Sequence, residues 1–103
     1  MIKVSVLYPN RAGSKFDMSY YLGTHIKLVK DKLGTALQGV HVDSGMSGAA
    51  PDSEPDYVAM GHLLFNSVGD FQAAFGPHAE AIMGDIPNYT DIEPQVVVSE
   101  IKC

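Results

Sequence analysis

The chain has 103 residues, of which 46% are hydrophobic and 18% charged, and its formal net charge is −5. This length suits one domain, and the apolar content excludes an intrinsically disordered chain. The acidic balance argues against nucleic acids and anionic membranes as partners, and no apolar run approaches the roughly 20 residues of a membrane-spanning helix. Strand-like residues open the sequence in place of a signal peptide, so we expect a single cytoplasmic domain over residues 1–103.

The first half of the chain predicts a strand, a helix and a second strand. Residues 2–8 alternate in hydrophobicity, which is typical of a strand with one buried face. A helix is expected over residues 18–33, with Asp17 as its N-cap and Gly34 directly after its last residue. A second strand is expected over residues 40–46.

The second half repeats this pattern in the order strand, helix, strand. A loop over residues 47–55 precedes a third strand at residues 57–66. A capping box at residues 67–70 opens a second helix that ends near Gly84, and the last strand is expected over residues 94–101. The order β-α-β-β-α-β predicts an α+β fold, the ferredoxin-like sandwich, with both helices on one face of an antiparallel sheet.

The third strand is apolar on both of its faces. Its side chains alternate between Tyr57, Ala59, Leu63 and Phe65 on one face and Val58, Met60 and Leu64 on the other. Because the helices can cover only one face of the sheet, something else must bury the second face. A second copy of the same sheet is the simplest candidate, so we expect a homodimer.

A histidine, His25, lies at the centre of the apolar stripe of the first predicted helix. The other members of the stripe are Met18, Tyr21, Leu22, Val29 and Leu33, whereas Tyr20 falls on a face expected to be solvated. Two interpretations of His25 are open. It is either a core histidine bonded to a carbonyl or a tyrosine hydroxyl, or a general base in an apolar pocket, for which a reference pKa of about 6.5 is suitable.

Aromatic side chains accompany His25 in the predicted interior. Tyr8, Tyr21 and Phe65 are expected to point toward it, either as walls of a pocket for a hydrophobic small molecule or as plain core packing. His62 lies on the Met60 face of the third strand, as a satisfied buried histidine or as a ligand contact. The histidines show no spacing typical of a metal site, and no glycine-rich phosphate loop is present, so we predict neither a metal nor a cofactor.

Three segments resemble the EthD family, named for the degradation of ethyl tert-butyl ether. They are residues 16–25, which end in His25, residues 75–78, and residues 86–91. The resemblance implies a dimeric α+β barrel related to cofactor-independent monooxygenases, muconolactone-type isomerases and haem-handling enzymes. Carried over by position, it implies site roles for the helix histidine, His25, and for the turn residues Asn88 and Tyr89. We do not predict haem.

The leading hypothesis is therefore a monooxygenase-like oxidoreductase of oxidative catabolism that acts on a small apolar or aromatic molecule. His25 would abstract or relay a proton. The residues expected to contact the substrate are Tyr8, Tyr21, His62, Phe65, Asn88 and Tyr89. Three alternatives stay open: a ligand carrier that supports a separate oxygenase, an isomerase of the muconolactone type, and a dimer whose interior is filled by side chains. The sequence leaves open whether the protein is an enzyme.

Overall fold

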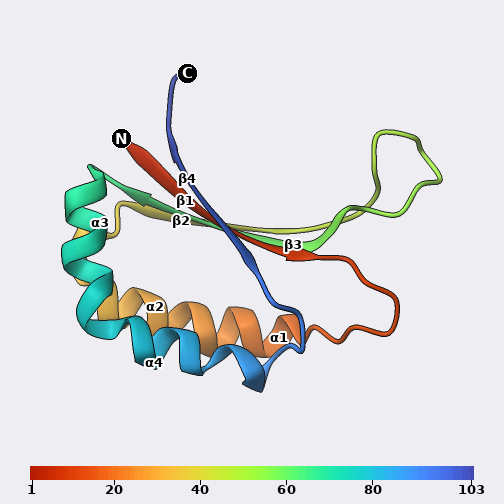
Figure 1. Ribbon diagram of the computed structural model, residues 1–103, viewed down its shortest axis with the longest axis horizontal. Coiled ribbons are helices and arrows are strands. Elements are labelled where there is room, and N and C mark those ends of the chain that lie inside the picture. Colours follow the sequence, from red (N-terminus) through yellow and green to blue (C-terminus); the bar gives the residue numbers. More distant parts are fainter.

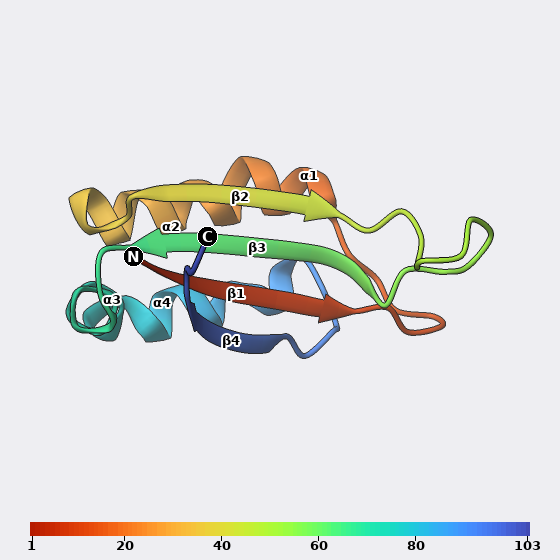
Figure 2. The same cartoon turned by 90° about the horizontal axis from the view of Figure 1, so that it is seen from above.

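The computed structural model describes residues 1–103 as a four-stranded antiparallel sheet with one layer of helices (Figure 1). The strands are β1 (Ile2–Pro9), β2 (Gly39–Ser44), β3 (Tyr57–Phe65) and β4 (Gln95–Glu100). They lie in the order β2-β3-β1-β4, and the helices all lie on the same side of the sheet (Figure 2). The predicted α+β, ferredoxin-like fold is confirmed.

Each predicted helix consists of several consecutive segments. The first comprises α1 (Met18–Tyr20), the π-helical turn η1 (Tyr21–His25) and α2 (Ile26–Leu33), followed by the 3₁₀ turn η2 (Gly34–Ala36). The second comprises α3 (Val68–Phe75), the 3₁₀ turn η3 (Gly76–His78) and α4 (Ala79–Gly84), with a further 3₁₀ turn η4 (Ile86–Asn88) after it. None of these helices combines the length and apolar character that crossing a membrane requires.

Both predicted N-caps are present. The carboxylate of Asp17 accepts a hydrogen bond from the backbone N–H of Tyr20 at 3.0 Å, and the hydroxyl of Ser67 accepts one from the backbone N–H of Asp70 at 3.0 Å. Each cap satisfies a backbone donor that has no partner within its helix.

The π-helical turn η1 changes which side chains of the first helix are buried. Its wide turn is closed by a hydrogen bond from the N–H of Ile26 to the carbonyl of Tyr21, five residues earlier. Tyr21 and His25 consequently both face the sheet, and Ile26 is buried beside them. Leu22 is 51% exposed, so its assignment to the buried stripe was wrong. The assignment had assumed a regular α-helical period throughout.

The two faces of the sheet differ in what covers them. On the helix-facing side, Val4, Ala59, Leu63 and Phe65 are buried, as the alternation in the first and third strands predicted. No helix covers the other side, which we call the open face. Its residues on the central strands are Lys3, Ser5 and Leu7 of β1 and Met60, His62 and Leu64 of β3, with Val97 of β4 beside Ser5.

Candidate functional site

A cavity of about 210 Å³ lies between the helices and the helix-facing side of the sheet. Fifteen residues line it, and thirteen of them are hydrophobic. His25 is the only histidine among them, and no lysine, arginine, aspartate or glutamate contributes to the lining. Two lining residues, Met83 of α4 and Val96 of β4, are 46% and 52% exposed, so the cavity reaches the surface between these elements.

His25 is held against this cavity by Asp85, the residue that follows α4. The Nδ1 atom of His25 lies 2.9 Å from Oδ2 of Asp85, although 60 residues separate the two in sequence. The side chains are 5% and 12% exposed. This is the one hydrogen bond of the imidazole to the protein, and the other ring nitrogen, Nε2, takes part in none.

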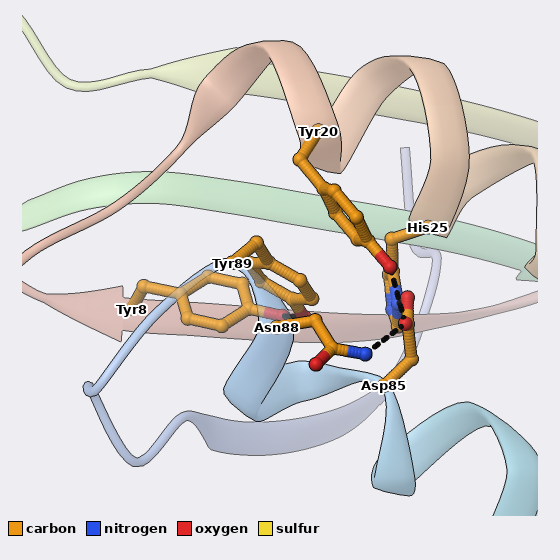
Figure 3. A network of polar contacts seen from close by, with 6 residues as sticks. All are labelled: Tyr8, Tyr20, His25, Asp85, Asn88 and Tyr89. Atoms are coloured by element: carbon orange, nitrogen blue, oxygen red, sulfur yellow. Dashed lines mark hydrogen bonds and ion pairs between the residues drawn. The ribbon is translucent and has the colours of Figure 1, made fainter.

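Two further side chains donate to the other oxygen of Asp85 (Figure 3). The hydroxyl of Tyr20 donates to Oδ1 at 2.7 Å, and the amide of Asn88 donates to the same atom at 2.9 Å. Burial raises the pKa of Asp85, but the hydrogen bonds from Asn88, Tyr20 and His25 outweigh it and hold that pKa below its ordinary value. The bond to Asp85 in turn raises the pKa of Tyr20. At neutral pH, Asp85 is therefore a carboxylate and Tyr20 a neutral donor.

Two tyrosine rings pack against His25, and a third, that of Tyr8, contacts both of them. The ring of Tyr21 stacks on the imidazole with a centroid distance of 5.6 Å, and the ring of Tyr89 lies 4.7 Å away on a tilted plane. The hydroxyls of Tyr8 and Tyr89 share a hydrogen bond of 2.6 Å. Burial is the main cause that raises the pKa of Tyr8, Tyr21 and Tyr89, so all three hydroxyls stay protonated.

A glycine on β3 makes room for one of these rings. A Cβ atom added to Gly61 would collide with the hydroxyl oxygen of Tyr21. Because Gly61 has no side chain, the hydroxyl of Tyr21 can approach β3, and Tyr21 lines the cavity with His25.

The hydrogen bond to Asp85 determines which tautomer the neutral imidazole of His25 adopts. An ionised Asp85 can only accept, so Nδ1 of His25 carries the hydrogen and Nε2 carries the lone pair. A histidine oriented in this way by a carboxylate can take a proton through Nε2 and stabilise the resulting imidazolium. No group of three or more His, Cys, Asp or Glu side chains lies close enough together to hold a metal ion.

The structure brings only some of the predicted site residues to the cavity. Tyr8 and Tyr21 line it together with His25. Tyr89 is buried beside His25 without lining the cavity, and Asn88 is exposed and contacts Asp85. Phe65 lies in the core, where its ring packs against Phe71 at 5.1 Å, and does not line the cavity.

His62 lies on the open face, away from the cavity. Its Nδ1 shares a hydrogen bond of 2.9 Å with the hydroxyl of Ser5, and its Nε2 lies 3.2 Å from Oδ2 of Asp43. Protein groups therefore lie beside both of its nitrogens, which favours the satisfied histidine among the two interpretations given above.

Sequence reasoning missed Asp85 and Tyr20. Tyr20 was assigned to a solvated face, yet it is half-buried and bonded to a carboxylate 65 residues away. Asp85 directly follows the end of the second helix and precedes the segment 86–91 that carries part of the family resemblance. That proximity is the one signal in the sequence that could have identified it.

Comparisons with known proteins agree with this architecture. The EthD domain model matches residues 14–93. An EthD-like protein of Ralstonia eutropha JMP134 is 41% identical with a TM-score of 0.94, covering 99% of this chain and 92% of that one. An ethyl tert-butyl ether degradation (EthD) family protein of Bacillus halodurans C-125 is 19% identical with a TM-score of 0.76, covering 99% of each chain.

A more distant match concerns the fold alone. A dimeric protein of unknown function and ferredoxin-like fold from Bacteroides fragilis NCTC 9343 is 14% identical, with a TM-score of 0.58 and coverage of 97% of this chain and 95% of that one. None of the curated proteins compared with the chain matches it. Since the family model spans most of the sequence and the Ralstonia protein matches nearly all of it at 41% identity, the chain belongs to the EthD domain family.

Proposed function

We propose that this EthD-family protein is a cofactor-independent enzyme of oxidative catabolism in which His25 takes a proton from a small apolar or aromatic molecule. One observation carries the proposal. A buried histidine is bonded to a carboxylate through Nδ1, while its Nε2 has no protein partner and the residue lines an apolar cavity. A base positioned in this way typically contributes about 10²- to 10⁴-fold to a proton transfer.

The size and charge of the cavity restrict the substrate. A dry apolar cavity of about 150 Å³ is large enough for benzene, so 210 Å³ suits a molecule of one or two rings. With no lysine or arginine in the lining, a carboxylate on the substrate would have no permanently charged partner and would have to be desolvated. This disfavours the muconolactone type of isomerase, whose substrate is an anion.

The oxidation can be written without a metal or an organic cofactor, with dioxygen as the co-reactant. His25 removes a proton from a CH2 group next to a ring or carbonyl group, the carbanion adds dioxygen, and the imidazolium returns the proton to the peroxide to form a hydroperoxide. Loss of water from the hydroperoxide leaves a carbonyl group at that carbon. The substrate thereby loses two hydrogen atoms and gains one oxygen atom, and the second oxygen leaves as water.

Paired neutral and anionic probes test this proposal. A tetralone and an indanone serve as neutral probes, because each has a CH2 group next to its carbonyl group, and a tetralone that carries a ring carboxylate serves as the matched anion. We expect the neutral probes to bind and the anion not to bind, with oxygen uptake and product formation lost in His25→Gln. Unchanged binding and turnover in a folded His25→Gln variant would exclude the proposed role of His25.

The nearly complete apolar lining also supports a second candidate, a ligand carrier that assists a separate oxygenase. Binding in such a protein would depend on cavity shape and require no base. Saturable binding of the neutral probes, without oxygen uptake or product across a broad panel, would favour the carrier over the enzyme.

We further propose that the open face pairs with a second copy of the chain. Leu7, Met60, Leu64 and Val97 leave this face partly apolar, and the distant Bacteroides fragilis neighbour is described as dimeric. Sedimentation should show a dimer for the wild type and a monomer for Met60→Asp. The control is Leu22→Asp, which places the same charge on the exposed side of the helices. A monomeric wild type at micromolar concentration would overturn this proposal.

A further inference from the structure

The two carboxylate oxygens of Asp85 have different partners. Oδ2 accepts from His25 alone, whereas Oδ1 accepts from both Tyr20 and Asn88 (Figure 3). A carboxylate bonded only to a histidine could rotate about its Cβ–Cγ bond and exchange its oxygens. Rotation here would break two additional hydrogen bonds, so the pair of neutral donors keeps Oδ2 directed toward His25.

Tyr20 also contacts the aromatic side of the site. Its ring stacks on that of Tyr89 at a centroid distance of 6.1 Å and an interplanar angle of 23°. Tyr89 packs against His25 at 4.7 Å, and its hydroxyl is anchored by that of Tyr8. Tyr20 therefore touches both groups that hold the imidazole, the carboxylate and the aromatic ring, without lining the cavity.

These contacts join two distant parts of the chain. Tyr20 is the last residue of α1, directly before the π-helical turn that carries His25, and Asn88 ends η4. Asn88 is exposed and Tyr20 half-buried, so the two donors close the site on its solvent side. A ligand in the cavity would meet His25 and would not meet either donor.

We propose that Tyr20 and Asn88 are positioning residues, which act through Asp85 to keep the neutral His25 in the Nδ1–H tautomer with Nε2 unprotonated. The inference rests on the proposed function for its catalytic meaning. The effect of the two donors on the tautomer of His25 can be measured without any substrate. Each donor contributes to the alignment, and the Tyr20 hydroxyl contributes more, because its hydrogen bond to Oδ1 is shorter (2.7 Å against 2.9 Å) and less exposed than that of Asn88.

Nuclear magnetic resonance of ¹⁵N-labelled protein tests the proposal directly. In spectra of the neutral imidazole, the ring nitrogen shifts of His25 should report the Nδ1–H tautomer. The signals are assigned by their loss in His25→Gln. In Tyr20→Phe, and to a smaller extent in Asn88→Ala, the two nitrogen shifts should move toward each other as the tautomers mix. The Nδ1 proton should also exchange faster with water.

Tyr57→Phe is the matched control, because it removes a tyrosine hydroxyl that donates to Gln95 at 3.2 Å outside the site. It should leave the His25 signals unchanged. If Tyr20→Phe and Asn88→Ala both fold and leave the His25 signals of the wild type intact, the positioning role is overturned. Asn88 is exposed, so its variant keeps the test decisive even if Tyr20→Phe fails to fold.

Kinetics with an oxidised neutral probe then connect positioning to catalysis. In Tyr20→Phe, kcat should fall about three- to tenfold, the usual range for one lost hydrogen bond, with KM nearly unchanged. A larger effect on KM than on kcat would overturn the positioning role. If no probe is turned over while the shifts change as expected, the proposed function fails and the positioning of His25 stands.

Discussion

The molecule contains two histidine–aspartate pairs, one on each side of its sheet, and only one of them borders the apolar cavity. On the helix-facing side, Asp85 bonds one nitrogen of His25, and the histidine lines a cavity with its other nitrogen free of protein partners. On the open face, His62 lies between Ser5 and Asp43, with a protein group beside each nitrogen. The pairing with a carboxylate is common to both. The free nitrogen beside an apolar cavity is not.

The carboxylates of the two pairs also differ. The side chain of Asp85 is 12% exposed and accepts from three donors, whereas that of Asp43 is 55% exposed and has a single side-chain neighbour, Nε2 of His62, at 3.2 Å. Water screens an exposed pair and weakens its contribution to stability.

Removing the two histidines separates the sites most strongly. His25→Gln should lower turnover of a neutral probe by at least about 100-fold, because the base is lost. His62→Gln should leave it within about twofold, because that side chain lies on the other side of the sheet. Oxygen uptake measures both, and circular dichroism confirms folding. Equal losses of turnover in His25→Gln and His62→Gln would contradict the assignment of the base to His25.

Neutralising the carboxylates gives the next largest effect. Asp85→Asn should lower turnover about 10- to 100-fold, since a histidine depends on the partner that orients it. The wild-type pKa of Asp85 lies below its ordinary value of about 3.9, so its carboxylate stabilises the folded state above about pH 4. That stabilisation is lost as the pH falls through the folded-state pKa.

Calorimetric unfolding as a function of pH checks the sign of this effect. Wild type should be more stable than Asp85→Asn at neutral pH, and the gap should close in acid. Asp43→Asn serves as the control, with a smaller loss of stability at neutral pH because the side chain is 55% exposed. A gap between wild type and Asp85→Asn that widens below about pH 4 would contradict the charged state assigned to Asp85.

Two glycines test the packing on the two faces. Gly61→Ala should cost about 1–3 kcal/mol in unfolding free energy and distort the cavity, because its Cβ displaces the hydroxyl of Tyr21. Gly39→Ala, on the open face, meets only the far end of the Leu64 side chain at 3.0 Å. Because alanine also suits a strand better than glycine, Gly39→Ala should lower the unfolding free energy by less than about 1 kcal/mol. Urea unfolding measures both variants. Equal losses of unfolding free energy would show that the Tyr21 side chain can move away from residue 61 at little cost.

The smallest effect belongs to the open face. Ser5→Ala removes the hydroxyl bonded to Nδ1 of His62 and should cost about 1 kcal/mol in unfolding free energy, the usual value for one hydrogen bond. The ring signals of His25 should not move. A shift in those signals would mean that the two histidine sites are coupled through β1.

The strands were predictable because their signals are local. Alternation of apolar and polar side chains and the turn residues between them placed the third strand at residues 57–66, and the structure has Tyr57–Phe65. The N-caps Asp17 and Ser67 were predictable for the same reason, since a cap bonds backbone groups within three residues. The α+β order follows from these local elements and the short connections between them.

The irregular turn in the first helix was not predictable from periodicity. A regular period assigned Leu22 to the core and Tyr20 to solvent, and the π-helical turn η1 reverses both assignments in part. Tertiary contacts stabilise this turn. The hydroxyl of Tyr21 lies close to Gly61, and His25 is hydrogen-bonded to Asp85. No pattern within residues 18–33 contains that information.

Local pattern in the amino-acid sequence is enough to define the order of strands and helices, the caps, and the burial of His25, because each depends on residues a few positions apart. The family resemblance adds the residues of the turn at 86–91. The working site depends on folding, because its contacts cross long separations: 60 residues for His25 and Asp85, 65 for Tyr20 and Asp85, and 81 for Tyr8 and Tyr89. Only packing of the helices on the sheet brings these groups within bonding distance and leaves one nitrogen of one histidine free beside a cavity.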